Sequence, residues 1–398
     1  MIYLVIVFLL LVLAVRYDIW GNTRYRDKWY NAMLVVFILV AGLRYRFAVD
    51  TIAYLYHFYN TIPTIDGLHI ELITTYKFEP FWILMNSLVK TFHGKFFIVQ
   101  LLQAGVVNVL IFKYIKKHSP YPFLCVFLYF IMDYHWYNMM VMRNSIAIAI
   151  CLFANDYIME KKWTRAFIVY GVAGMFHYSS LVFMFITPFL TFLRFDKKGL
   201  SVLLAMLPIG AIFVLYFEDI LMAMAFNDTV SDKLDSYMED DAFDADKYSV
   251  VYFFVIVFIP AIYTILSLYY VKRFKYKNNL ERVEPFVMIG LIFYVLRFNI
   301  GFLNRFSNAY HVYFIIFYVQ FFMDMYRKGR ELKGLFPLLT PVSIFIPYLF
   351  VTIALWYQGR INYYPYYTIV DKNIDYDRER YYSESRPYIT DIDENTEY

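Results

Sequence analysis

The chain has 398 residues, of which 61% are hydrophobic and 22% are aromatic, and its mean hydropathy is +0.48. Its formal net charge is only +4. A soluble protein of this length does not need so much apolar surface, so the composition argues against two or three soluble domains and favours one polytopic membrane protein. The two cysteines, Cys125 and Cys151, lie in apolar runs, and they indicate neither a disulfide framework nor a metal motif.

Repeated apolar runs predict an all-α protein with about twelve transmembrane helices. The predicted spans are residues 2–17, 29–44, 95–115, 121–136, 143–159, 163–177, 179–194, 199–217, 249–271, 284–300, 306–325 and 335–357. No basic residue precedes the first span and several follow it, which favours a signal anchor over a cleaved signal peptide. Basic residues concentrate in alternate turns, most clearly at 161–165, 272–277 and 327–330, so both termini are predicted to lie outside the cytoplasm.

Three outer segments stand out by size, at 45–94, 218–248 and 358–398. Within the first, the stretch EPFWILMNSLV at 79–89 begins like a helix but is too short to span a bilayer, which favours a re-entrant or interfacial helix. The second is acidic and is most simply a solvated loop. We therefore divide the chain into a transmembrane domain, 1–357, and a Tyr-rich extracytoplasmic tail that is ordered near residues 363–367 and loose beyond them.

Several charged residues and histidines lie at the outer ends of the predicted spans, where their placement beside apolar segments requires a physical explanation. Those residues are Arg44, Arg46, Asp50, Glu79, Asp133, His135, Arg143, His177, Arg297 and Arg305. Arg143 is the most informative, because it opens an apolar helix in the stretch MRNSIAIAI, and an unpaired guanidinium at a helix centre costs about 2.5–3.5 kcal/mol. An anionic partner is therefore expected. Arginine offers a planar fork suited to phosphate oxygens, so several arginines facing one cavity would suit a pyrophosphate group.

Simpler interpretations of the same residues stay open. Arg44 and Arg46 would snorkel at the interface, and Arg305 would cap its own helix. Arg143 would pair with Asp133 or Asp50 and tie helices together. His177, at a tight turn, would be a satisfied structural residue. The sequence contains no phosphate-binding glycine loop, no G-x-S-x-G, no H-E-x-x-H and no metal-ligand spacing, and it gives no indication of a nucleic-acid partner, a metal or another cofactor.

Four short motifs, in order along the chain, resemble those of the EpsG/Wzy-like polysaccharide polymerases. They are RYRFAVDTIAY at 44–54, EPFWIL at 79–84, MRNSIA at 142–147 and FHYSS at 176–180. The resemblance covers roughly residues 1–370. Ala48 or Val49 stands where the family usually has Gly before the aspartate, which weakens the prediction of a tight turn at Asp50, and Asn144 stands where Gln is common.

The resemblance implies a polymerase of the bacterial cytoplasmic membrane that acts on the outer face, with a fold like that of the GT-C glycosyltransferases. Its substrates would be polyprenyl-diphosphate-linked oligosaccharide repeat units within the lipid bilayer, and a chain-length regulator and a flippase would be its partners in capsule or exopolysaccharide synthesis. Arginines would neutralise the diphosphate leaving group, and no metal is needed.

The residues are assigned to three roles on this basis. The diphosphate would be bound by Arg143 and Arg305, with Arg44, Arg46 and Arg297. The acceptor hydroxyl would be oriented or deprotonated by His177, Asp50 or Glu79. Sugar faces would stack on Tyr54, Trp82, Trp136 and Tyr137, although these aromatics would equally form an interfacial belt.

Three rival functions remain. A transporter or flippase for lipid-linked sugar would suit twelve spans in paired halves, but it needs charges near the membrane midplane, where this chain has almost none. The second rival is a membrane acyltransferase or an O-antigen ligase-type transferase. A ligase would use the same lipid-diphosphate donor, and the sequence separates it poorly from a polymerase. A structural partner in a synthase complex would have no chemistry of its own.

Overall fold

The computed structural model describes residues 2–69, 78–191, 199, 201, 261, 264–269, 280–296, 303–332, 364–373 and 375–385. Within these residues the regular structure is helical, apart from an isolated antiparallel bridge between Arg44 and Thr368. The all-α prediction is therefore confirmed for the described part of the chain. The chain forms two compact units, one of Met1–Ile186 with Thr352–Tyr398 and one of Thr187–Val351.

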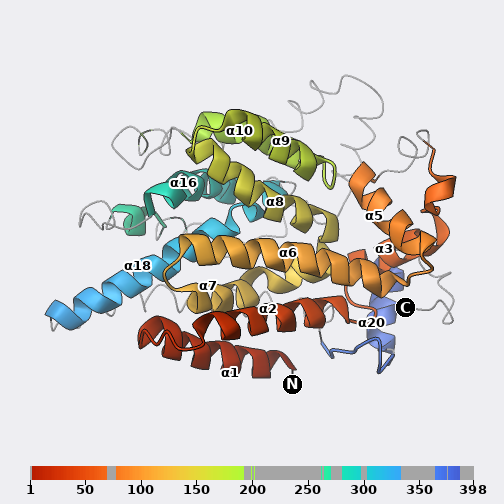
Figure 1. Ribbon diagram of the computed structural model, residues 1–398, viewed down its shortest axis with the longest axis horizontal. Helices are drawn as coiled ribbons and strands as arrows, with labels where there is room; N and C mark the ends of the chain where they lie inside the picture. Colours follow the sequence, from red (N-terminus) through yellow and green to blue (C-terminus); the bar gives the residue numbers. More distant parts are fainter. Residues whose placement is uncertain are drawn as a thin grey trace. The chain divides into compact units, whose positions relative to one another are not determined.

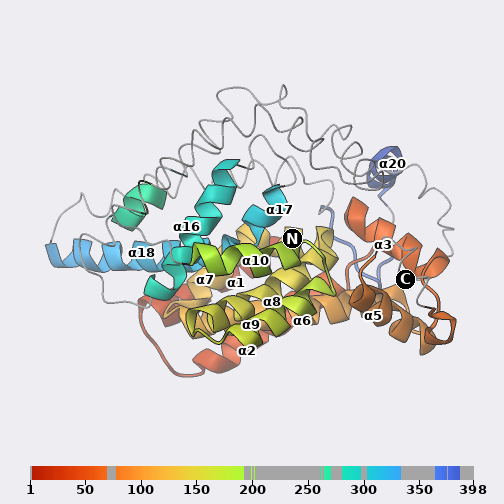
Figure 2. The ribbon, with the colours of Figure 1, turned by 90° about the horizontal axis from the view of Figure 1, so that it is seen from above.

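The first unit is a helical bundle with three further helices gathered at one end (Figures 1 and 2). The helices of the bundle are α1 (Ile2–Ala14), α2 (Arg26–Gly42), α6 (Phe96–His118), α7 (Pro122–Tyr129), α8 (Met142–Met159) and α9 (Trp163–Gly174). The helices gathered at one end are α3 (Val49–Asn60), α5 (Pro80–Thr91) and α20 (Tyr376–Ser385). Two π-helical segments, Phe130–Tyr134 and Trp136–Met140, continue α7 toward α8, and α10 (Ser180–Leu190) begins in this unit.

Close helix packing and buried amides hold the bundle together. Helix α2 packs on α6, α6 on α8, and α8 on α9. The contact between α2 and α6 requires Gly42, because a Cβ atom there would lie 2.3 Å from Leu101 Cδ2 and 2.9 Å from Leu101 Cα. The buried amide of Gln103 on α6 donates to Ser145 Oγ on α8 at 2.9 Å. These contacts fix the start of α8, where Arg143 lies, against the core of the bundle.

The second unit contains α16 (Leu280–Leu296), α17 (Leu303–Asn308) and α18 (His311–Leu332), and α16 packs on both of the others. The span predicted at 306–325 is interrupted, because the chain turns at Ala309 and Tyr310, and α18 begins at His311 and covers the rest of that span. Tyr310 is buried and its hydroxyl lies 3.1 Å from Thr187 Oγ1, so its packing stabilises the turn.

Within the described residues, helices occupy most of each predicted span from 2–17 to 179–194 and of the span 284–300. The spans 199–217, 249–271 and 335–357 lie largely or wholly outside the described residues, as does the outer loop 218–248. Within the described part, two helices are long and apolar enough to cross a membrane, Ile2–Ile19 and Phe96–His118, and Pro122–Tyr134 is a shorter apolar helix. The twelve membrane crossings therefore stay a prediction.

The tail departs from its prediction. Residues 364–369 lie along the end of α2, and the chain then forms α20, although it was expected to be loose beyond residue 367. Helix α20 is polar by composition, yet Arg378 and Tyr382 on it are 2% and 1% exposed. Tertiary contacts to residues 46–53, rather than intrinsic helix propensity, therefore stabilise this helix.

Candidate active site

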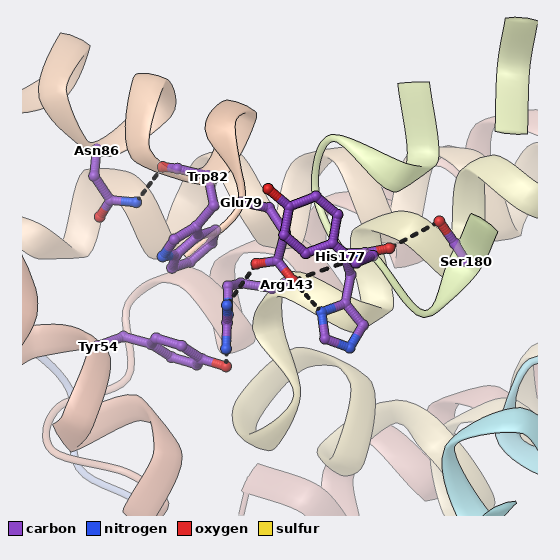
Figure 3. Close-up of polar contacts among 8 residues, drawn as sticks. Tyr54, Glu79, Trp82, Asn86, Arg143, His177 and Ser180 are labelled. Carbon is purple, nitrogen blue, oxygen red and sulfur yellow. Dashed lines mark hydrogen bonds and ion pairs between the residues drawn. The ribbon is translucent and has the colours of Figure 1, made fainter. Parts of the chain in front are cut away.

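Arg143 lies in the first turn of α8 and its guanidinium reaches toward α5 and α3 (Figure 3). Its Nη1 lies 2.5 Å from Glu79 Oε2, and its Nε donates to the Tyr54 hydroxyl at 3.4 Å. The Arg143 side chain is 18% exposed, whereas that of Glu79 is 4% exposed. The anionic partner that the sequence predicted for Arg143 is therefore a carboxylate of the protein itself, that of Glu79.

Glu79 is the centre of the cluster. It directly precedes α5, whose first residue is Pro80, a residue suited to the first helical position because it lacks an N–H. Its second oxygen, Oε1, lies 2.7 Å from His177 Nδ1 and accepts the backbone N–H of Tyr178 at 3.3 Å. Burial acts to raise the pKa of Glu79, but the hydrogen bond from His177 and the charge of Arg143 outweigh it, so the pKa lies below its ordinary value of 4.5. Glu79 is ionised at neutral pH.

His177 is held by the turn between α9 and α10. Ser180 Oγ donates to the His177 carbonyl at 2.9 Å, and the Phe81 N–H donates to the carbonyl of Met175 at 2.9 Å, which joins the start of α5 to this turn. Because Glu79 is ionised and can only accept, His177 Nδ1 carries a proton and donates a hydrogen bond to the carboxylate. In the neutral imidazole Nε2 is then an acceptor, and it makes no hydrogen bond to any residue that the structure describes.

Aromatic rings enclose the guanidinium. The Cζ atom of Arg143 lies 4.6 Å from the centroid of the Phe78 ring and 5.5 Å from that of Tyr54, within the range of cation–π attraction. The Tyr54 ring in turn lies 5.1 Å from that of Trp82, which is 1% exposed. Low-dielectric walls of this kind strengthen the ion pair and any further interaction of the arginine with an anion.

The ion-pair partner of Arg143 differs from the partners that the sequence suggested. A purely structural role for Arg143 was expected to pair it with Asp133 or Asp50, whereas the structure pairs it with Glu79. The pairing also changes the premise that a bound anion must repay the cost of burying the arginine, because Glu79 already offsets much of it. What remains for a ligand is the unpaired side of the guanidinium, since Nη2 makes no hydrogen bond within the described residues.

The other predicted arginines do not join this cluster in the part of the chain that the structure describes. Arg44 is fully buried and donates to Thr51 Oγ1 at 3.2 Å, to Met142 Sδ at 3.3 Å and to the Ala41 carbonyl. Arg46 makes a two-pronged ion pair with Glu379 on α20, with both N–O distances 2.6 Å. Arg297 and the side chain of Arg305 lie outside the described residues.

The remaining predicted residues are spread around this end of the bundle. Asp50 lies in the first turn of α3 and is partly exposed. Trp136 and Tyr137 lie in the second π-helical segment, where Tyr137 is fully buried and presents no ring face to solvent.

Among the described residues, no group of three or more His, Cys, Asp or Glu side chains is placed to hold a metal ion.

Two participants were missed by sequence reasoning. Phe78 stacks under the guanidinium, and the Tyr178 backbone binds Glu79. Phe78 precedes Glu79 in the chain, and Tyr178 follows His177. These neighbouring positions were the only indication in the sequence, since neither an apolar ring nor a backbone N–H belongs to a recognisable motif.

A helical bundle with apolar spans and an ion-paired arginine at a helix mouth defines a membrane protein with a polar site at one end of its helices. The profile of the EpsG family matches residues 28–368, and the chain belongs to that family. The family is membrane-embedded, and membership indicates a general role in polysaccharide polymerisation. No curated protein and no solved structure matched the chain.

Proposed function

We propose that the protein polymerises polyprenyl-diphosphate-linked oligosaccharide repeat units, and that Arg143, Glu79 and His177 form its catalytic centre. The observation that carries the proposal is the geometry around one carboxylate. Glu79 binds a cation through one oxygen and an imidazole through the other, at 2.5 and 2.7 Å. Among the residues that the structure describes, none binds Arg143 Nη2 or His177 Nε2, and we propose that both atoms contact the substrate.

Arg143 would stabilise the leaving group. As the bond between the anomeric carbon and the diphosphate oxygen breaks, the electron pair and the developing negative charge go to the lipid diphosphate. A preorganised guanidinium in a partly dry site stabilises such charge, and removing one such donor typically costs about 10²–10³-fold in rate. Glu79 and the Tyr54 hydroxyl hold the guanidinium in place, so little reorganisation is needed during the reaction.

His177 would act as the general base. The acceptor hydroxyl attacks the anomeric carbon and transfers its proton to Nε2, so that the imidazole becomes an imidazolium while the diphosphate departs. Glu79 fixes the tautomer and stabilises this cation through Nδ1, the role of the third group in a nucleophile–base–carboxylate arrangement. Because both of its oxygens are engaged, Glu79 serves as a positioning residue in this scheme rather than as the base.

The site would face the outside of the bacterial cytoplasmic membrane, in a bundle of about twelve spans with a GT-C-like arrangement. Helix α8 supports this placement, because Arg143 lies at its start while Asp156 near its end pairs with Lys117 at 2.7 Å, beside the basic turn at 161–165. An 18-residue helix is about 27 Å long, close to the thickness of the hydrocarbon core. Lysines would mark the inner end and the catalytic centre the outer end.

The test is purified protein in lipid vesicles, supplied with lipid-linked repeat units that carry a labelled sugar. A ladder of lipid-linked products that differ by whole repeat units supports the proposal. Transfer of the sugar to another acceptor without a ladder would instead indicate a ligase. Movement of intact lipid-linked units across the bilayer without new linkages would indicate a transporter, and either of these results overturns polymerisation.

A further inference from the structure

The C-terminal segment 364–385 crosses the end of the bundle that carries the candidate active site. Its first part runs against the end of α2, where the Tyr45 N–H donates to the carbonyl of Tyr367 at 3.0 Å and the Ile369 N–H donates to that of Leu43 at 2.9 Å. The Tyr366 hydroxyl donates to the Val40 carbonyl at 2.8 Å. We call residues 364–385 the C-terminal strap.

The second part of the strap, α20, is bound to the link between α2 and α3. Glu379 accepts two hydrogen bonds from the guanidinium of Arg46, each 2.6 Å long. The Tyr382 hydroxyl accepts the backbone N–H of Ala48 at 2.6 Å, and the Tyr382 ring is 1% exposed. Two-pronged arginine–carboxylate pairs and bonds to buried N–H groups are among the stronger polar contacts in proteins.

The backbone at this link needs such support. Arg46 and Ala48 have φ values of +49° and +65°, which residues other than glycine rarely adopt. Residues in these conformations persist only where their surroundings hold them. The two strained residues are the same two that Glu379 and Tyr382 bind, so the strap holds the strained turn that sets where α3 begins.

Helix α3 connects the strap to the active site. Val49, Ile52 and Ala53 pack with Tyr382, and their spacing places them on one face of the helix. Tyr54 and Thr51 lie on the opposite face, where the Tyr54 hydroxyl accepts from Arg143 and Thr51 Oγ1 donates to the Met139 carbonyl at 2.5 Å. A change in how Tyr382 packs on α3 would therefore shift Tyr54, which binds the guanidinium of Arg143.

We infer that the C-terminal strap positions the active site: Glu379 and Tyr382 hold α3 so that Tyr54 aligns the guanidinium of Arg143, which places both among the positioning residues of the polymerase. The inference rests on the proposed function for its catalytic part. Both residues lie beyond the family match, which ends at residue 368, so the strap's helix is a feature of this chain outside the matched part.

The test uses the full-length protein in lipid vesicles with two readouts. The variants are Glu379→Gln and Tyr382→Phe, and the matched control is Glu384→Gln, an exposed glutamate on the same helix. The first readout is amide hydrogen exchange of residues 49–60, which needs no activity. Loss of a charge-assisted or buried hydrogen bond should speed exchange there by about tenfold or more, while the control stays at the wild-type rate.

The second readout is polymerisation of lipid-linked repeat units. The two variants should lower kcat by about tenfold with little change in KM, because misalignment of Arg143 affects the transition state more than substrate binding. Arg46→Glu combined with Glu379→Arg should restore part of the rate, which a general loss of stability would not do.

The outcomes separate the two claims. If the wild-type protein forms no polymer, the proposed function fails, while the exchange measurement still shows whether the strap holds α3. Unchanged exchange at 49–60 in both variants overturns the inference. Faster exchange with wild-type kcat also overturns it, because α3 would then be held without any consequence for the reaction.

Discussion

Glu79 and His177 lie 98 positions apart in the chain, and Oε1 of the glutamate is 2.7 Å from Nδ1 of the histidine. The contact joins the start of α5, which lies within the first predicted outer segment, to the turn between α9 and α10. With Arg143 on the other oxygen, one carboxylate holds together three elements that are distant in sequence. The catalytic proposal depends on this carboxylate more than on any single cation.

Replacement of Glu79 should show its effect in the pH dependence of stability. The pKa of Glu79 in the folded protein lies below its ordinary value of 4.5, so its contribution to stability is complete above pH 4.5 and is lost as the pH falls through the folded-state pKa. Thermal unfolding of wild type and Glu79→Gln should therefore differ by a constant amount above pH 4.5, with wild type more stable, and converge below it. A difference that stays constant to about pH 2 would contradict the ionised pair.

His177→Asn separates catalysis from structure. The asparagine amide can take the place of Nδ1–H and donate to Glu79, but the side chain has no counterpart of Nε2. Polymerisation should fall by about 10²–10⁴-fold while the unfolding temperature stays near that of wild type. His177→Leu is the paired variant, and it should lose both activity and about 1–3 kcal/mol of stability, because the buried carboxylate of Glu79 then loses the shorter of the two hydrogen bonds to Oε1. Wild-type polymer from His177→Asn would exclude the base role.

Gly42→Ala tests the close packing that supports α8. The added methyl would meet both the side chain and the backbone of Leu101, with the Cα only 2.9 Å away, so the free energy of unfolding should fall by about 1–3 kcal/mol. Gly105→Ala is the control on α6, where the added Cβ meets nothing within 4 Å. That variant should be stabilised by about 0.5–1 kcal/mol, since alanine favours a helix interior. Equal effects of the two substitutions on thermal unfolding would contradict the packing.

Ala48→Gly tests the strained turn before α3. The φ value of +65° costs alanine about 1–3 kcal/mol, whereas glycine adopts it freely and loses about 0.4–1 kcal/mol through its more flexible unfolded state. The matched variant is Ala53→Gly within α3, which should cost about 1 kcal/mol because it lies in a helix interior. The Ala48 variant should therefore be at least about 1 kcal/mol more stable than the Ala53 variant in chemical unfolding. The reverse order would show that no strain resides at Ala48.

Periodicity and helix-start signals predicted most of the described helices, because apolar runs and Pro80 act locally. The break at Ala309–Tyr310 was not predicted, although the polar residues Ser307, Asn308 and His311 flank it, because the apolar residues that follow dominated the predicted span. The departure at Ala48 weakened the prediction of a turn before Asp50, yet the turn is present, with alanine in a backbone conformation that usually favours glycine.

The sequence marked Tyr54, Glu79, Trp82, Arg143 and His177 for separate roles, and the structure brings these residues together. Their mutual pairing was not predictable, because several acidic residues at the outer helix ends were equally plausible partners for Arg143. The pairing of Arg46 with Glu379 was also hidden, since the tail carries many acidic residues and gave no sign of a helix. The expected convergence of several arginines rested on their positions at the outer ends of the predicted spans, and it did not account for carboxylates of the protein itself.

Substitution of Arg143 tests the central claim most directly. Arg143→Ala leaves Glu79 without its cation, and breaking such a pair can cost about 3–5 kcal/mol, so a double variant is needed beside it. Glu79→Gln with Arg143→Met removes both charges together and keeps similar volumes, which should preserve the fold. Arg143→Lys keeps the charge but loses the planar fork.

The measurement is the length distribution of lipid-linked polymer made by each purified variant, at matched amounts of folded protein. The account predicts that Arg143→Lys, and the double variant that lacks both charges, leave single repeat units on lipid and form no ladder. A ladder of wild-type length from the double variant would contradict the account, because the leaving diphosphate would then need neither the guanidinium nor the carboxylate that holds it.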